Sequence, residues 1–145
     1  AEAVAVNEEQ EFLLVDGSPG IGCPVIASLN GVDAALIVTE PTKSGLADLK
    51  RVVQVAEHFS IPVWVVINKY DLNHDLTAEI QSFCTREELS VLGTIPFAKT
   101  IVEAMRQGRL IVESQPDSKP AAALKSIWRE IESRLFAPQE TANSN

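Results

Sequence analysis

The sequence is poor in the residue types that build metal centres and disulfide bonds. Its 145 residues include 2 cysteines, 2 histidines and 1 methionine. Cys23 and Cys84 lie far apart without the spacing of metal ligands, so we expect no zinc and no iron-sulfur cluster held within these residues. Two isolated thiols are typical of a reduced, cytoplasmic protein. Because the one methionine is Met105, residue 1 is not a translation start, and we expect a processed N-terminus or a piece of a longer chain.

Long apolar stretches and an excess of positive charge are also missing. The longest apolar runs, such as Pro62 to Ile67, are far shorter than the ~20 residues that cross a bilayer. We therefore expect no membrane span, and we expect no signal peptide. The 20 acidic residues outnumber the 12 basic ones, and the formal charge of −8 disfavours attraction to nucleic acid or anionic lipid. Nucleic acid is therefore not an expected partner.

The sequence does contain the pattern of a folded α/β domain. Hydrophobic residues make up 46% and charged residues 22%, as in a globular protein with a core. Continuous apolar runs predict strands covered on both faces, at Phe12 to Val15, Ala34 to Thr39, Pro62 to Ile67 and Val91 to Ile95. Helical periodicity predicts helices at Ser44 to Phe59, Asp75 to Glu88, Thr100 to Gln107 and Ala121 to Phe136. Ser44 is the expected N-cap of the first helix. The alternation of strands and helices predicts a three-layer α/β/α fold with a mainly parallel sheet.

We expect one domain with a short appendage. Residues 1–113 form the main unit, residues 114–120 a linker, and residues 121–136 a helix packed on the same domain. Residues 137–145 are small and polar, which predicts a disordered tail. The short alternation over residues 1–6 predicts an extra edge strand.

Chemistry is expected beyond the carboxyl ends of the strands, where open parallel sheets bind ligands. The first strand is followed by Asp16-Gly17-Ser18-Pro19-Gly20-Ile21-Gly22. A carboxylate at a strand end followed by a Gly/Pro loop suits a magnesium-nucleotide site, because the carboxylate holds a metal-bound water and glycine amides approach the terminal phosphate. A tight turn capped by Asp16 explains the same residues without a ligand.

Two more strand ends carry residues suited to a nucleotide base. The third strand is followed by Asn68-Lys69-Tyr70-Asp71, which matches the NKxD spacing of nucleotide-binding P-loop proteins. In that motif the Asn holds the base-binding loop, the Lys stem covers the base and the Asp can accept hydrogen bonds from guanine. The fourth strand is followed by Pro96 and Phe97, which suit contact with a base. The alternatives are a polar turn for the first motif and packing of Phe97 beneath the next helix.

Four segments carry a joint pattern, which reads LLVDGSPGIGCPVIASL, ALIVTEPTKSGLADLKRVV, IPVWVVINKYDLN and VLGTIPF. Together, from about Phe12 to Glu113, they resemble the carboxy-terminal half of the MinD/ParA-type P-loop ATPases. The closest resemblance is to the MinD-like subgroup that carries an inserted ferredoxin domain. The resemblance implies a cytoplasmic ATPase that uses ATP and Mg²⁺ as a conformational switch. It also implies a partner, which would be a second copy of the chain, an electron carrier or a metallocluster target.

On the phosphate side, the resemblance implies that Asp16 is the Walker B or switch II aspartate, catalytic through water in the Mg²⁺ shell. It implies that Gly20 contacts the γ-phosphate through its amide. The family's glycine-rich phosphate loop, of the GKGGxGKT kind, is absent from these residues, as are the ferredoxin insert and its cluster cysteines. We therefore expect this chain alone to be inactive, to bind no nucleotide tightly and to hold no iron-sulfur cluster.

On the base side, the resemblance implies that Asn68 reads the base and that Pro96 and Phe97 line its pocket. Lys69 and Asp71 complete the nucleotide-binding motif. Because the resembling family binds ATP whereas a complete NKxD motif also suits guanine, the residues leave ATP and GTP both open.

Two other functions remain open on the residues alone. A phosphoacceptor receiver domain would use Asp16 as the acceptor, together with Thr39 and Lys99. A receiver also needs an acidic pair after an earlier strand, and Glu8-Glu9 does not follow an apolar run. A non-enzymatic interaction module would instead pair its open sheet edge with itself or with a partner.

Overall fold

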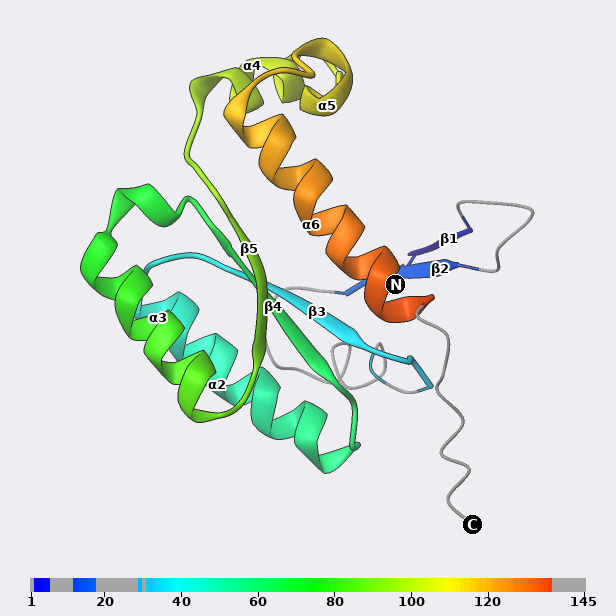
Figure 1. Ribbon diagram of the computed structural model, residues 1–145, viewed down its shortest axis with the longest axis vertical. Coiled ribbons are helices and arrows are strands. Elements are labelled where there is room, and N and C mark those ends of the chain that lie inside the picture. Colours follow the sequence, from blue (N-terminus) through cyan, green and yellow to red (C-terminus); the bar gives the residue numbers. More distant parts are fainter. Residues whose placement is uncertain (1, 6–11, 18–28, 30, 137–145) are drawn as a thin grey trace.

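The computed structural model describes residues 2–5, 12–17, 29 and 31–136 (Figure 1). In chain order its elements are β1 (Glu2–Ala5), β2 (Leu13–Asp16), β3 (Ala35–Thr39), α2 (Lys43–His58), β4 (Val63–Asn68), the 3-10 helix η1 (Tyr70–Leu72), α3 (His74–Arg86), β5 (Ser90–Ile95), α4 (Lys99–Arg106), α5 (Ile111–Ser114) and α6 (Lys119–Leu135). The strands and helices expected from the apolar pattern are present. A strand, β1, also forms within residues 1–6, but it lies in a separate two-stranded sheet with β2 and not at the edge of the parallel sheet. Helix α5 was not expected.

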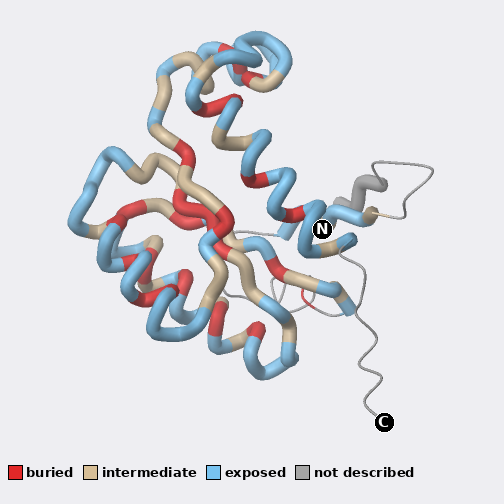
Figure 2. The backbone as a smooth tube through the Cα atoms, in the orientation of Figure 1, coloured by how far each residue is buried: buried red, intermediate tan, exposed pale blue. Residues whose placement is uncertain are grey.

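Strands β3, β4 and β5 form a parallel sheet in that order. Helices α2 and α3 cover one face and α6 covers the other (Figure 1). The central strand β4 shows why its sequence is apolar without alternation: Val65 and Ile67 pack against α2 and α3, whereas Val66 packs against α6. Figure 2 shows the buried residues gathered along this strand and on the inner sides of the helices. The predicted three-layer α/β/α architecture is confirmed.

Helix α2 begins at a threonine cap. The Oγ1 of Thr42 accepts a hydrogen bond from the Gly45 amide at 2.9 Å, and Thr42 has the extended backbone, with φ −128° and ψ 158°, that an N-cap requires. The prediction of Ser44 as the cap is wrong, because Ser44 already lies inside the helix. The buried face of the helix consists of Leu46, Leu49, Val53 and Ala56.

The first predicted strand, β2, lies outside the parallel sheet. It pairs antiparallel with β1, in a register that sets Glu2 opposite Asp16 and Ala5 opposite Leu13. The expectation of a parallel neighbour in the same sheet is therefore wrong. An antiparallel pair needs only a short connection, whereas a parallel pair needs a crossover of a dozen residues or more. The hairpin meets α6 through Phe12 and Trp128, whose rings contact edge to face at 5.4 Å.

Strand β3 keeps one side of its surface uncovered. Leu36 and Val38 lie opposite Trp64 and Val66 and therefore on the α6 side of the sheet, yet they are 39% and 58% exposed. Helix α6 packs mainly over β5. Among the described residues, no strand pairs with the outer edge of β3. None of the described helices is long and apolar enough to span a membrane.

Candidate functional site

The loop after β4 is fixed by its own backbone and by α3. Asn68 ends the strand, and Lys69 adopts the left-handed conformation with φ 54°, which turns the chain into η1. The hydroxyl of Thr77, a buried residue of α3, donates a hydrogen bond of 2.7 Å to the carbonyl oxygen of Tyr70. The motif predicted to bind a base is therefore held in one conformation against the helix that follows it.

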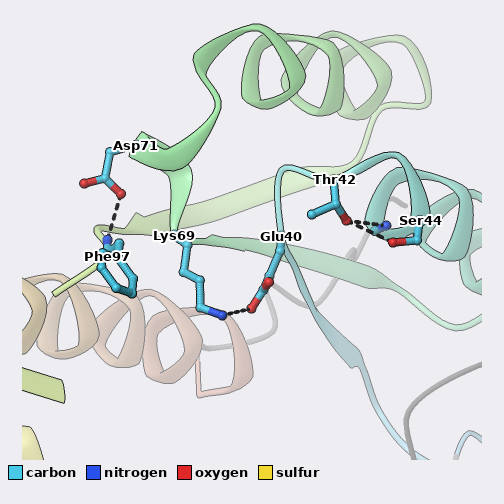
Figure 3. A network of polar contacts seen from close by, with 7 residues as sticks. Glu40, Thr42, Ser44, Lys69, Asp71 and Phe97 are labelled. Atoms are coloured by element: carbon cyan, nitrogen blue, oxygen red, sulfur yellow. Dashed lines mark hydrogen bonds and ion pairs between the residues drawn. The ribbon is translucent and has the colours of Figure 1, made fainter. Parts of the chain in front are cut away.

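Asp71 joins this loop to the loop that follows β5. Its Oδ1 accepts a hydrogen bond from the Phe97 amide at 2.7 Å (Figure 3). Phe97 is 41% exposed, so it is not fully buried, although contact with the next helix stays open as an alternative. Two sequence-predicted base-binding segments, 26 residues apart, are thus brought into direct contact.

Lys69 is engaged elsewhere. Its Nζ lies 2.7 Å from the Oε1 of Glu40, the residue after β3, and both side chains are about two-fifths exposed. Figure 3 shows that Lys69 extends toward Glu40, while Asp71 extends toward Phe97. The charged residues of the motif therefore connect the loops that follow β3, β4 and β5.

A shallow, open cavity of about 560 Å³ lies between these loops and the start of α6. It is lined by Tyr70, Asp71, Thr94, Pro96, Phe97, Ala98, Lys119, Pro120 and Ala123. Its volume is in the range of small-molecule sites. Of the residues predicted to bind the base, Asp71, Pro96 and Phe97 line it, whereas Asn68 and Lys69 do not.

The contribution of α6 to the cavity was missed from the sequence. Lys119 and Pro120 lie in the first turn of α6, after Ser118, whose Oγ accepts a hydrogen bond from the Ala121 amide at 3.4 Å. The Ser-Lys-Pro start is a recognisable helix N-terminus. Helical periodicity identifies the helix but does not say which strand its first turn approaches.

The residues predicted for the phosphate side are not assembled around this cavity. Asp16 is exposed at the end of β2, in the separate hairpin, and Gly20 lies outside the described residues. Thr39 is buried at the end of β3, and Lys99 opens α4. A receiver domain requires its acceptor aspartate in the same sheet as the threonine strand, so the described residues do not support that alternative.

The described residues do not by themselves fit a metal centre. No group of three His, Cys, Asp or Glu side chains suited to a metal ion occurs among them. Cys84 is buried on α3, and desolvation by this burial raises the pKa of its thiol. It is therefore a protonated core residue and not a thiolate ligand. Cys23 lies outside the described residues.

Comparison with known proteins gives a consistent family. The ParA family model described as NUBPL iron-transfer P-loop NTPase matches residues 3–132. The iron-sulfur cluster carrier protein of Aquifex aeolicus is 32% identical over 131 residues, which cover 81% of this chain and 35% of that protein. The chain spans between 34% and 48% of the length of the curated relatives that it matches.

Solved structures agree with the fold. The septum site-determining protein MinD of Pyrococcus horikoshii, in complex with Mg-ADP, has a TM-score of 0.69 at 20% identity, over 83% of this chain and 50% of its own. The cell division ATPase MinD of Pyrococcus furiosus has a TM-score of 0.68 at 25% identity, over 82% of this chain and 50% of its own.

Proposed function

Because this chain belongs to the ParA family, whose model is described as NUBPL iron-transfer P-loop NTPase, we propose that it supplies the base side of the nucleotide site of a longer ATPase. The observation that carries the proposal is the cavity at the carboxyl ends of β4 and β5, where Asp71, Pro96 and Phe97 converge. Carboxyl ends of parallel strands are the usual ligand sites of such sheets. Phe97 is partly exposed and offers aromatic surface to a base. Asn68 ends β4 but does not line the cavity, so its proposed reading of the base is not supported by this lining.

The phosphate side of the site is proposed to come from another segment. Asp16 would act on the Mg²⁺ shell and Gly20 on the γ-phosphate once a phosphate-binding loop is supplied. Bound Mg²⁺ would neutralise charge on the phosphates. The described residues alone do not fit that ion, and the sequence contains no GKT-type phosphate loop. We therefore expect the groups that stabilise the transferred phosphoryl to come from another segment.

The open side of β3 is the proposed docking place for that segment. Leu36 and Val38 expose apolar side chains there, and the outer edge of the strand has no partner among the described residues. An unpaired edge next to an uncovered apolar face favours addition of further strands. Pairing of two copies at the same edge is the competing outcome, and size-exclusion chromatography over a range of concentrations distinguishes it from a monomer.

In the intact protein, nucleotide binding and hydrolysis are proposed to switch the handling of an iron-sulfur cluster. The support is the relatives named iron-sulfur cluster carrier protein. The cluster would be cargo, held by residues other than Cys84, because that thiol is buried and protonated. Reconstitution of this chain with iron and sulfide should therefore give no cluster absorption that depends on Cys84.

Two measurements test the proposal. Millimolar ADP should shift the backbone amide resonances of Asp71, Phe97 and Ala98, while those of Glu57 and His58 at the far end of α2 stay in place as an internal control. With ATP and Mg²⁺, phosphate release by the chain should equal that of its Asp16→Ala variant. Unmoved cavity resonances would contradict the base site, and release above the variant would contradict a missing phosphate side.

A further inference from the structure

The aspartate of an NKxD motif can serve a nucleotide site in two ways. It can read guanine, by accepting the two neighbouring N–H groups of that base with its two carboxylate oxygens. Alternatively, it can hold the protein around the base. The proposed function leaves open which of these tasks Asp71 performs.

One carboxylate oxygen of Asp71 is hydrogen-bonded to the protein backbone. Its Oδ1 accepts the Phe97 amide at 2.7 Å, which is a short distance for a bond between an amide and a charged acceptor. Ile95 ends β5 and Pro96 has no N–H, so Phe97 carries the first backbone donor after the strand. Asp71 pairs that donor at the wall of the cavity.

Other contacts of the loop hold Asp71 in the position from which it pairs with the Phe97 amide. The left-handed turn at Lys69 and the bond from Thr77 to the Tyr70 carbonyl fix the backbone on the N-terminal side of Asp71. Lys69 itself pairs with Glu40. The loop is therefore constrained on both sides of Tyr70, and these contacts hold the Asp71 carboxylate facing the Phe97 amide.

We propose that Asp71 is a positioning residue, which fixes the Pro96-Phe97 wall of the cavity and does not read the base. This inference rests on the proposed function for its ligand, but the contact itself can be tested without a nucleotide. Its consequence is that loss of the Asp71 carboxylate disturbs adenine and guanine nucleotides alike.

The first experiment measures hydrogen exchange of the Phe97 amide by NMR in the full chain. Asp71→Ala should raise its exchange rate about tenfold or more, because a bond to a charged acceptor is lost. Asp71→Asn keeps an acceptor oxygen and should stay within about threefold of the unmodified chain. Glu79→Ala removes an exposed carboxylate from α3 without touching Phe97 and serves as the matched control. Unchanged amides in β4 show that each variant is folded.

The second experiment compares ADP with GDP, read from the amide shifts of Phe97 and Ala98. In Asp71→Ala the ratio of the two dissociation constants should stay within about twofold of the unmodified ratio, since neither base loses a direct contact. A selective loss of GDP binding, or unchanged exchange at Phe97 in Asp71→Ala, overturns the positioning role. If neither nucleotide binds the unmodified chain, the proposed function fails, while the exchange rates still decide what Asp71 does.

Discussion

Gly93 of β5 lies directly beneath Ile127 of α6, and this contact allows a sharp test of how the helix is placed. A Cβ atom added at Gly93 would lie 2.7 Å from Ile127 Cγ1 and 3.2 Å from Cδ1. Ile127 is 6% exposed and belongs to the core between α6 and the sheet, so either its side chain or the helix must shift to relieve the overlap. Overpacking of this kind costs about 1–3 kcal/mol. We therefore expect Gly93→Ala to lower the free energy of unfolding by about 2 kcal/mol.

Urea denaturation followed by tryptophan fluorescence measures this loss, since Trp64 lies on β4 and Trp128 on α6. Ile127→Ala removes the clashing Cγ1 and should cost about 2–5 kcal/mol alone. Combined with Gly93→Ala it should cost less than the sum by about 1 kcal/mol or more, because the new methyl group occupies the vacated space. Ile127→Val keeps a Cγ1 atom and should give little relief.

The matched control is Ile131→Ala, one turn further along the buried face of α6, outside the immediate surroundings of the added Cβ. Its cost should add to that of Gly93→Ala within about 0.5 kcal/mol. Additivity of the Gly93 and Ile127 substitutions would refute the direct contact, as would a Gly93→Ala protein as stable as the unmodified chain.

Two further substitutions test local features of the fold. Gly45→Ala should lower the melting temperature, because the new Cβ atom would overlap the Glu40 carbonyl oxygen and lie 3.0 Å from Thr42 Oγ1. This overlap should outweigh the preference of alanine over glycine in helices, which is about 1 kcal/mol. A raised melting temperature would contradict this packing. Cys84 is 1% exposed and should resist iodoacetamide in the folded chain but react in urea, as read by mass spectrometry of its peptide. Because burial raises the pKa of the Cys84 thiol, the stability it contributes is complete below the unfolded value of about 8.5 and is lost as pH rises above it. Cys84→Val should remove that part of the pH dependence.

The layers of the fold could be predicted because burial on both faces leaves a direct mark on sequence. Val65, Val66 and Ile67 alternate between two cores, so β4 has to be apolar at every position. The sequence of a strand does not show in the same way which other strand it pairs with. The run that becomes β2 is equally apolar, yet it pairs with β1, since its composition does not specify which edge it joins. The cap of α2 was misplaced for a related reason: Thr42 and Ser44 are both capping residue types, and only the backbone angles distinguish them.

For the candidate site too, the location could be predicted from the sequence, whereas the contacts of its charged residues could not. Strand ends can be read from the sequence, so the position of the motif beside Pro96 and Phe97 was predictable. The tasks of its charged residues were not, because they depend on the left-handed turn at Lys69 and on partners distant in sequence. With this turn in place, the Lys69 ammonium pairs with Glu40 and the Asp71 carboxylate accepts a hydrogen bond from the Phe97 amide. The same spacing would serve a motif whose aspartate reads the base. The match to NKxD therefore predicts where a nucleotide would bind, whereas the role that we propose for Asp71 follows from its contact with the Phe97 amide.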